Sequence, residues 1–188
     1  MKAQNQHITK LIERCKNSDQ TAQMEVYNGY YKAMYNTSLR ILKDEFEAED
    51  LMQESFLTAF TKLHTFKGEV TFGAWLKRIV INKSLTQLKK NNRYEDVKME
   101  IVSDNNVEEE QVNYSAVDPK EVLNYINSLK DNYRLVLTLN LIEGYDYEEI
   151  AEILKYTNEN VRTTVSRAKK KLKQVILANT NKIQEYGR

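Results

Sequence analysis

Hydrophobic residues recur every three to four positions along most of this chain, which is the spacing of amphipathic α-helices. The pattern predicts a short helix over residues 7–17 and longer helices over 20–43, 46–63 and 72–91. Asp19 precedes the second helix and offers it an N-terminal cap. The core stripe expected on that second helix consists of Met24, Tyr27, Tyr31, Met34, Ser38, Leu39 and Leu42.

The helical periodicity disappears over residues 92–118 and then returns. This stretch is rich in Asn, Asp, Glu and Ser, and it ends just before Pro119, which disfavours helix in the preceding residue. Gly144 is placed to end a helix, and Asp146 with Glu149 has the spacing of a capping box. Helices are therefore predicted at 122–129, 132–143 and 147–154, and a turn at 155–157 leads into a final helix.

The sequence thus predicts an all-α protein with two small helical domains joined by a flexible acidic linker. The expected boundaries are 1–91 for an N-terminal helical bundle, 92–119 for the linker, 120–178 for a helix-turn-helix domain and 179–188 for a hydrophilic tail. One Pro and five Gly leave little turn chemistry for hairpins, which excludes a β-sandwich.

Composition excludes several classes of site. One Cys, with only His7 and His64 beside it, allows neither a disulfide framework nor a Cys/His zinc site of four protein ligands. The sequence has no EF-hand loop, Walker loop, dinucleotide fingerprint or nucleophile elbow, so we expect no metal, no cofactor and no enzyme activity. No apolar run reaches the roughly 18 residues of a membrane span, and we expect a cytoplasmic protein without membrane insertion.

The charges are segregated along the chain, although the net charge is only +1. Residues 75–93 carry six basic and no acidic side chains, and residues 161–173 do the same. Between these segments, residues 94–121 carry two Lys against nine acidic side chains, a net charge of −7. Segregation of this kind indicates charged partners more clearly than the total does.

The last two predicted helices have the arrangement of a DNA-reading helix-turn-helix. A helical hairpin with a solvated Lys-rich face is the alternative. The absence of acids over 161–173 favours DNA, because a merely solvated face normally mixes charges. The apolar residues expected to join the two helices are Ile150, Ala151, Leu154, Val161 and Val165.

The segment 66–90 places Phe66, Phe72 and Trp75 around a Gly-containing loop, before a basic helix. Aromatic side chains beside cations form stacking platforms for unpaired bases. Core packing is nevertheless the favoured role for any single aromatic residue here, and especially for Trp75, which lies on the apolar stripe of its helix. Asn82 and Lys83 are expected on the helix surface.

The helix over 46–63 has an acidic side. Composition alone favours a solvated face, or acids that stabilise the first turn of the helix. The polar residues on this side are Glu47, Glu49, Asp50, Gln53 and Glu54.

Three segments carry a more specific signal: AEDLMQESFLTAF at 48–60, FKGEVTFGAWLKRIVINKSLTQLKK at 66–90, and EGYDYEEIAEILKYTNENVRTTVSRAKKKLKQ at 143–174. In this order and at this spacing they resemble bacterial RNA polymerase sigma factors. The nearest group is the small extracytoplasmic-function (ECF) group of the sigma-70 family. The resemblance spans roughly residues 10–90 and 120–177. It implies a factor that binds core RNA polymerase and promoter DNA, reading the −35 element as duplex and the −10 element as melted strand.

The resemblance also implies a role for individual residues. Docking on the clamp coiled coil of the polymerase is implied for Glu49, Asp50, Gln53 and Glu54. Capture of a flipped −10 base is implied for Asn82 and the loop from Phe66 to Phe72, with Lys77, Arg78 and Lys83 against the DNA backbone. Contacts to the −35 element are implied for Arg162, Thr163, Ser166, Arg167 and Lys170. The acidic linker would thread the polymerase channel meant for RNA.

A stand-alone helix-turn-helix regulator is the main alternative. It explains residues 120–177 equally well, but it leaves the segment 66–90 and the acidic helix as coincidences. An enzyme has only scattered Glu and Tyr to recommend it. Within the ECF group an anti-sigma factor is a common further partner, and the resemblance makes one expected here.

Overall fold

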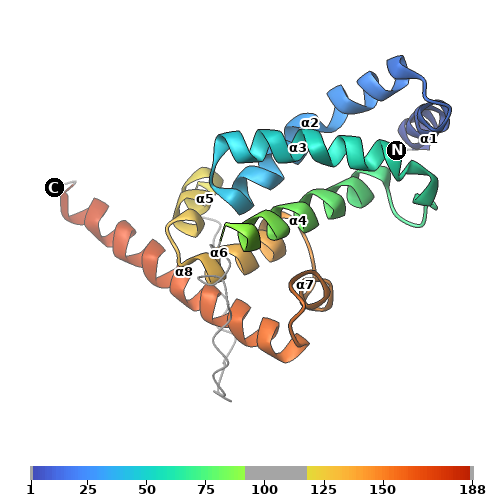
Figure 1. The fold of residues 1–188 in the computed structure, drawn as a ribbon. Coiled ribbons are helices and arrows are strands. Elements are labelled where there is room, and N and C mark those ends of the chain that lie inside the picture. Colours follow the sequence, from blue (N-terminus) through green and yellow to red (C-terminus); the bar gives the residue numbers. More distant parts are fainter. Residues whose placement is uncertain (1, 92–117, 187–188) are drawn as a thin grey trace. The chain divides into compact units, whose positions relative to one another are not determined.

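The computed structural model describes residues 2–91 and 118–186, and every regular element within these ranges is helical (Figure 1). The chain divides into two compact units, residues 1–92 and 93–188, and each is described by itself. Most of the predicted linker therefore lies outside the described residues. Within the described ranges, no helix combines the length and apolar character that crossing a membrane requires. The all-α prediction is confirmed.

The N-terminal unit contains α1 (Lys2–Lys16), α2 (Gln20–Leu42), α3 (Glu45–Thr61), the 3-10 turn η1 (Leu63–Thr65) and α4 (Phe72–Lys90). Helices α2, α3 and α4 pack against one another, and α1 packs against α2 (Figure 1). A side chain caps the start of three of these helices, which satisfies backbone N–H groups that have no partner inside a helix. The caps are Asp19 on Ala22 N at 3.1 Å, Asp44 on Glu47 N at 2.9 Å and Thr71 on Ala74 N at 3.2 Å.

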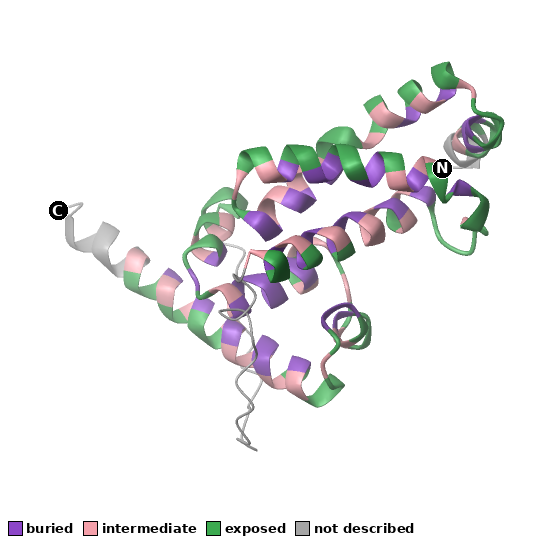
Figure 2. Ribbon diagram, viewed as in Figure 1, coloured by how far each residue is buried: buried purple, intermediate pink, exposed green. Residues whose placement is uncertain are grey.

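The stripe predicted on α2 is only partly correct. Met34, Ser38 and Leu42 are buried, but Met24 is 59% exposed and Tyr31 is 44% exposed. A single line of residues at helical spacing describes one contact face, whereas α2 packs against three other helices. Figure 2 shows buried residues along the sides of α2, α3 and α4. The buried residues of α2 are Ala22, Val26, Met34, Thr37, Ser38, Ile41 and Leu42.

Two helical glycines of this unit differ in the space around them. A Cβ added at Gly29 would meet nothing within 4 Å, whereas one at Gly73 would lie 2.9 Å from Cε1 of Tyr30. Alanine in place of glycine normally stabilises a helix by about 0.5–1 kcal/mol. We expect Gly29→Ala to raise the free energy of unfolding by about this amount and Gly73→Ala to give no gain. Urea unfolding of both variants checks this, and equal gains would show that Tyr30 moves aside at no cost.

The C-terminal unit contains α5 (Pro119–Asn127), α6 (Asp131–Leu137), the π-helical turn η3 (Thr138–Ile142), α7 (Tyr147–Leu154) and α8 (Asn158–Tyr186). Helix α8 packs against α5, α6 and α7. The capping box at the start of α7 is formed as its spacing predicts. Glu149 N donates to Asp146 Oδ1 at 2.8 Å, and Asp146 N donates to Glu149 Oε2 at 2.9 Å.

Three helix boundaries in this unit differ from the prediction. Helix α5 begins at Pro119, which the prediction gave to the linker; proline suits the first position of a helix. The helix predicted over 132–143 is an α-helix only as far as Leu137, and η3 follows. The predicted tail, 179–188, is helical as far as Tyr186. No Pro or Gly interrupts α8, and its hydrophilic residues are compatible with a helix.

Candidate nucleic-acid and protein interfaces

The turn between α7 and α8 has a defined geometry. Lys155 adopts the left-handed region at φ 59°, and its backbone N–H donates to Ala151 O, which ends α7. Two residues later Thr157 Oγ1 accepts a hydrogen bond from Asn160 N at 3.2 Å, at the start of α8. Lys169 of α8 also contacts Tyr147 of α7. Its Nζ lies 3.3 Å from Tyr147 Oη and 5.8 Å from the centroid of the Tyr147 ring.

The predicted helix-turn-helix packing is present. Ile150, Leu154, Val161 and Val165 are buried, and Ala151 is half-buried. Burial of these apolar side chains on one side of α8 directs the opposite side outward.

The outward side of α8 carries the residues that the sequence associates with the −35 element. Arg162 and Lys170 are exposed, while Thr163, Ser166 and Arg167 are partly exposed. Neighbouring Thr164 is different, because it is buried and donates to Asn160 O at 2.8 Å. The structure therefore gathers all five predicted residues on one accessible face, and arginine, serine and threonine are side chains that bond to base edges.

The aromatic residues around the loop 66–71 form a cluster. Phe66 is half-buried, with ring centroids 5.7 Å from Phe72 and 5.4 Å from Trp75. Phe72 is only 3% exposed and also lies edge-on against Tyr30, at 5.4 Å. Phe72 is therefore packed into the core, as favoured for a single aromatic in this segment, and the DNA-contacting role implied for it stays a prediction. Trp75 is half-buried in the same cluster, in keeping with the packing role favoured for it.

The polar residues of α4 divide between two sides of the helix. Asn82 is exposed, and Arg78 lies one helical turn before it and is partly exposed, as is Lys77. Lys83 points toward α3 instead, where its Nζ lies 3.1 Å from Oε2 of Glu54. The structure thus places Arg78 and Asn82 together and directs Lys83 to the acidic helix.

The acidic side of α3 is accessible along its length. Glu49, Asp50, Gln53 and Glu54 are all exposed, and only Glu54 of these four has the ion pair with Lys83 described above. The opposite side of α3 is buried and consists of Ala48, Leu51, Met52, Ser55, Phe56 and Ala59. The four predicted polymerase-binding residues therefore share one solvent-facing surface.

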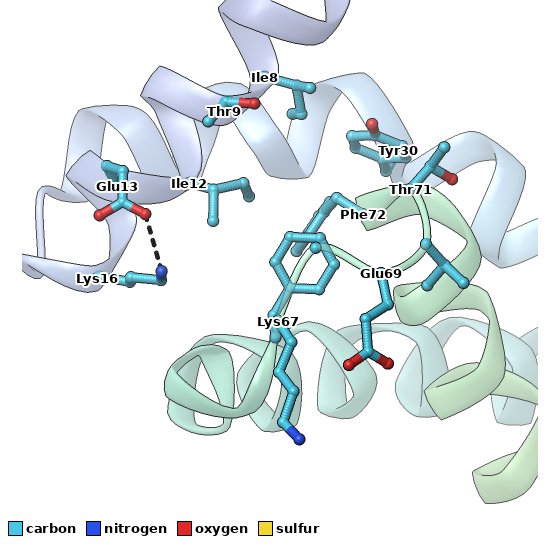
Figure 3. A pocket seen from close by; sticks show the side chains of 13 residues that line it. Ile8, Thr9, Ile12, Glu13, Lys16, Tyr30, Lys67, Glu69, Thr71 and Phe72 are labelled. Carbon is cyan, nitrogen blue, oxygen red and sulfur yellow. Dashed lines mark hydrogen bonds and ion pairs between the residues drawn. The ribbon is translucent and has the colours of Figure 1, made fainter.

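A pocket that the sequence did not reveal lies between α1 and the loop 66–71. Its volume is about 590 Å³, and Figure 3 shows side chains from both segments converging on it. Ile8 and Ile12 of α1 line one side of the pocket, Phe66 also lines it, and Lys67 and Glu69 project from the loop at its edge. Burial raises the pKa of the Tyr30 hydroxyl in its lining, so this group stays neutral at physiological pH. The pocket thus has apolar walls and a charged edge.

The described residues contain no group of three or more His, Cys, Asp or Glu side chains that could hold a metal ion. Cys15 is buried in α1, and burial raises the pKa of its thiol, which disfavours the reactive thiolate.

Comparisons with known proteins bear on both units. The family description "Sigma-70 region 2" matches residues 26–94, and "Sigma-70, region 4" matches residues 120–172. The ECF RNA polymerase sigma factor SigW of Bacillus subtilis is 30% identical over 179 residues, which cover 89% of this chain and 95% of SigW. The ECF RNA polymerase sigma factor SigM of the same organism is 28% identical, covering 84% of this chain and 96% of SigM.

Two solved structures have a similar fold, and one of them is a sigma factor. RpoE of Bartonella quintana, in a complex with the anti-sigma factor NepR, matches with a TM-score of 0.56 and 24% identity. That match covers 81% of this chain and 95% of RpoE. CnrH in complex with the cytosolic domain of CnrY matches with a TM-score of 0.55 and 21% identity, over 89% of this chain and 96% of CnrH.

Proposed function

Because this chain belongs to the ECF group of sigma-70 RNA polymerase sigma factors, we propose which of its surfaces serves each task of such a factor. It directs core RNA polymerase to promoters and initiates transcription. One observation carries the assignment: exposed acids gather on one side of α3, whereas the charged residues of α4, and those of α8 over 161–173, are all basic. A stand-alone regulator is not favoured, because the match to Sigma-70 region 2 covers most of the N-terminal unit.

The −35 element is read by α8. Its N-terminal half enters the major groove, where Arg162, Thr163, Ser166 and Arg167 reach base edges, and Lys170 contacts phosphate. The gathering of these five side chains on the accessible side of α8 supports this role.

The −10 element is held by α4 and the loop 66–71 as unpaired strand. Asn82 offers an amide that both donates and accepts hydrogen bonds, while Lys77 and Arg78 meet the backbone phosphates. A flipped base enters the pocket beside Phe66, whose half-buried ring offers a stacking surface. Trapping unpaired bases in this way favours the melted promoter without covalent chemistry.

Core polymerase is bound by the acidic side of α3, through Glu49, Asp50, Gln53 and Glu54. The acidic stretch 94–121 suits a cationic channel that the transcript later occupies. Sigma factors are non-catalytic initiation factors, and we assign no enzyme activity and no cofactor to this chain. We place it in the cytoplasm, where its polymerase acts.

An anti-sigma factor is the further partner that we propose. RpoE and CnrH were both solved with proteins bound to them, and NepR is an anti-sigma factor. The similarity of fold supports a comparable inhibitor for this chain.

Co-elution with bacterial core RNA polymerase, in moderate salt and without DNA, tests the proposed function. The full-length chain is expected to move into the polymerase peak. Its absence from that peak, together with tight binding of the free chain to duplex DNA, would favour the stand-alone regulator.

Asn82→Ala is expected to change the base preference within the −10 element and to leave polymerase affinity unchanged. The side chain is exposed on α4, so its removal disturbs no core contact. Base preference is measured by selecting promoters from a randomised −10 pool with the holoenzyme, alongside a polymerase titration. A fall in both would show that Asn82 has a structural role.

A further inference from the structure

Two large hydrophobic side chains of α3 are left in solvent. Phe46 is 85% exposed and Leu57 is 69% exposed, the highest values among the large hydrophobic side chains of the described residues. An isolated exposed hydrophobic residue is ordinary on a protein surface and needs no explanation. Phe46 and Leu57, however, project from the same side of α3.

Phe46 and Leu57 lie on one line along α3. They are eleven positions apart, which is close to three full turns, so they project from the same side at a separation of about 16 Å along the axis. Asp50 and Gln53 fall between them at the spacing of successive turns. The solvent side of α3 therefore presents an apolar residue, an acid, an amide and a second apolar residue in a row, and Figure 2 shows α3 exposed on one side and buried on the other.

Local structure does not account for Phe46. A hydrophobic staple would pair the residue before the N-cap with the fourth helical residue, but the residue before Asp44 is Lys43, and Phe46 is only the second residue of α3. Phe46 also belongs to none of the aromatic ring pairs found in the described residues; the nearby pairs involve Tyr27, Phe56 and Phe60.

We propose that Phe46 and Leu57 are the two apolar anchors of the surface through which α3 binds core polymerase. This inference rests on the proposed function, and it adds the residues that supply most of the affinity. The partner surface carries basic side chains opposite Glu49, Asp50 and Glu54, with an apolar contact at each end of them. Charge complementarity identifies this occupant, because the two apolar residues bracket the acids already assigned to polymerase.

The two kinds of residue have different effects on binding. Buried aromatic and aliphatic anchors hold a complex together, so their removal speeds dissociation. Exposed charges mainly steer association, and their contribution falls as salt rises. Phe46 and Leu57 therefore set the lifetime of the complex, and the acids set its rate of formation and its dependence on salt.

The test is a titration of core RNA polymerase with the full-length chain at two salt concentrations, with association and dissociation rates recorded. Phe46→Ala and Leu57→Ala are each expected to weaken binding by about tenfold through faster dissociation, with the salt dependence unchanged. Asp50→Asn is expected to slow association and to reduce the salt dependence. Leu177→Ala is the matched control, because Leu177 is 51% exposed on α8 and lies far from α3 in the sequence.

The outcomes separate this inference from the function on which it rests. Failure of the unaltered chain to bind core polymerase overturns the proposed function. Suppose instead that binding responds to Asp50→Asn but stays within twofold for the Phe46→Ala, Leu57→Ala double variant. That result overturns the anchor role of Phe46 and Leu57 and leaves the proposed function intact. Phe46 and Leu57 are exposed, so unchanged helicity and thermal unfolding of the double variant are expected and are checked in parallel.

Discussion

Arg167→Ala is expected to weaken binding of the holoenzyme to −35 duplex by about 1–3 kcal/mol, the usual worth of a good base contact. Arg167 is partly exposed on the same side of α8 as Thr163 and Ser166. Its planar guanidinium can make two parallel hydrogen bonds to guanine, which alanine cannot replace. The measurement is equilibrium binding at fixed salt to a fragment selected from a random −35 pool, because affinity for DNA has meaning only at a stated salt concentration.

Lys171→Ala provides the matched control for this prediction. Lys171 is exposed on α8 one helical turn after Arg167 and is not among the residues assigned to base contacts, and its removal changes the net charge by the same amount. An equal loss for both variants would mean that Arg167 contributes only general attraction to phosphate. Unchanged affinity for Arg167→Ala would remove this residue from the reading face.

Leu172→Ala is expected to lower the free energy of unfolding of the C-terminal unit by about 2–5 kcal/mol. Leu172 is fully buried on α8, the helix that packs against α5, α6 and α7. Truncation removes apolar contacts and leaves a cavity on the buried side of α8. Hydrogen exchange on the full-length chain is the suitable measurement, because it reports on each helix separately.

The same substitution at an exposed position of α8 separates burial from helix effects. Leu177→Ala, at 51% exposure, is expected to change protection little. Amides of α5–α8 should lose protection in Leu172→Ala while those of α2–α4 keep theirs. Equal loss of protection in both units would contradict the independence of the two cores.

The features that the sequence predicted well are governed by local interactions. The capping box of Asp146 and Glu149 depends on residues three positions apart, and the cap at Asp19 depends on Ala22. The helix-turn-helix packing also follows from apolar residues close together in sequence. These elements form through hydrogen bonds and apolar contacts between residues close in sequence, so a pattern along the chain is enough to find them.

The features that the sequence missed depend on residues far apart. The pocket joins Ile12 to Phe66, and the inward position of Phe72 depends on Tyr30. Lys83 pairs with Glu54, 29 positions earlier, and no local pattern indicates this contact. Periodicity shows which side of a helix is apolar and leaves open which other helix covers it.

The ion pair between Lys83 and Glu54 can couple the binding of polymerase to the binding of DNA, but its strength limits that coupling. Polymerase that takes Glu54 releases Lys83 for DNA, and by thermodynamic reciprocity DNA that takes Lys83 favours polymerase equally. The side chains are 31% and 69% exposed, and exposed pairs of this kind contribute about 0.2–1 kcal/mol. Cooperativity carried by this pair is therefore at most about fivefold. A larger dependence of promoter binding on polymerase must arise elsewhere in the assembly.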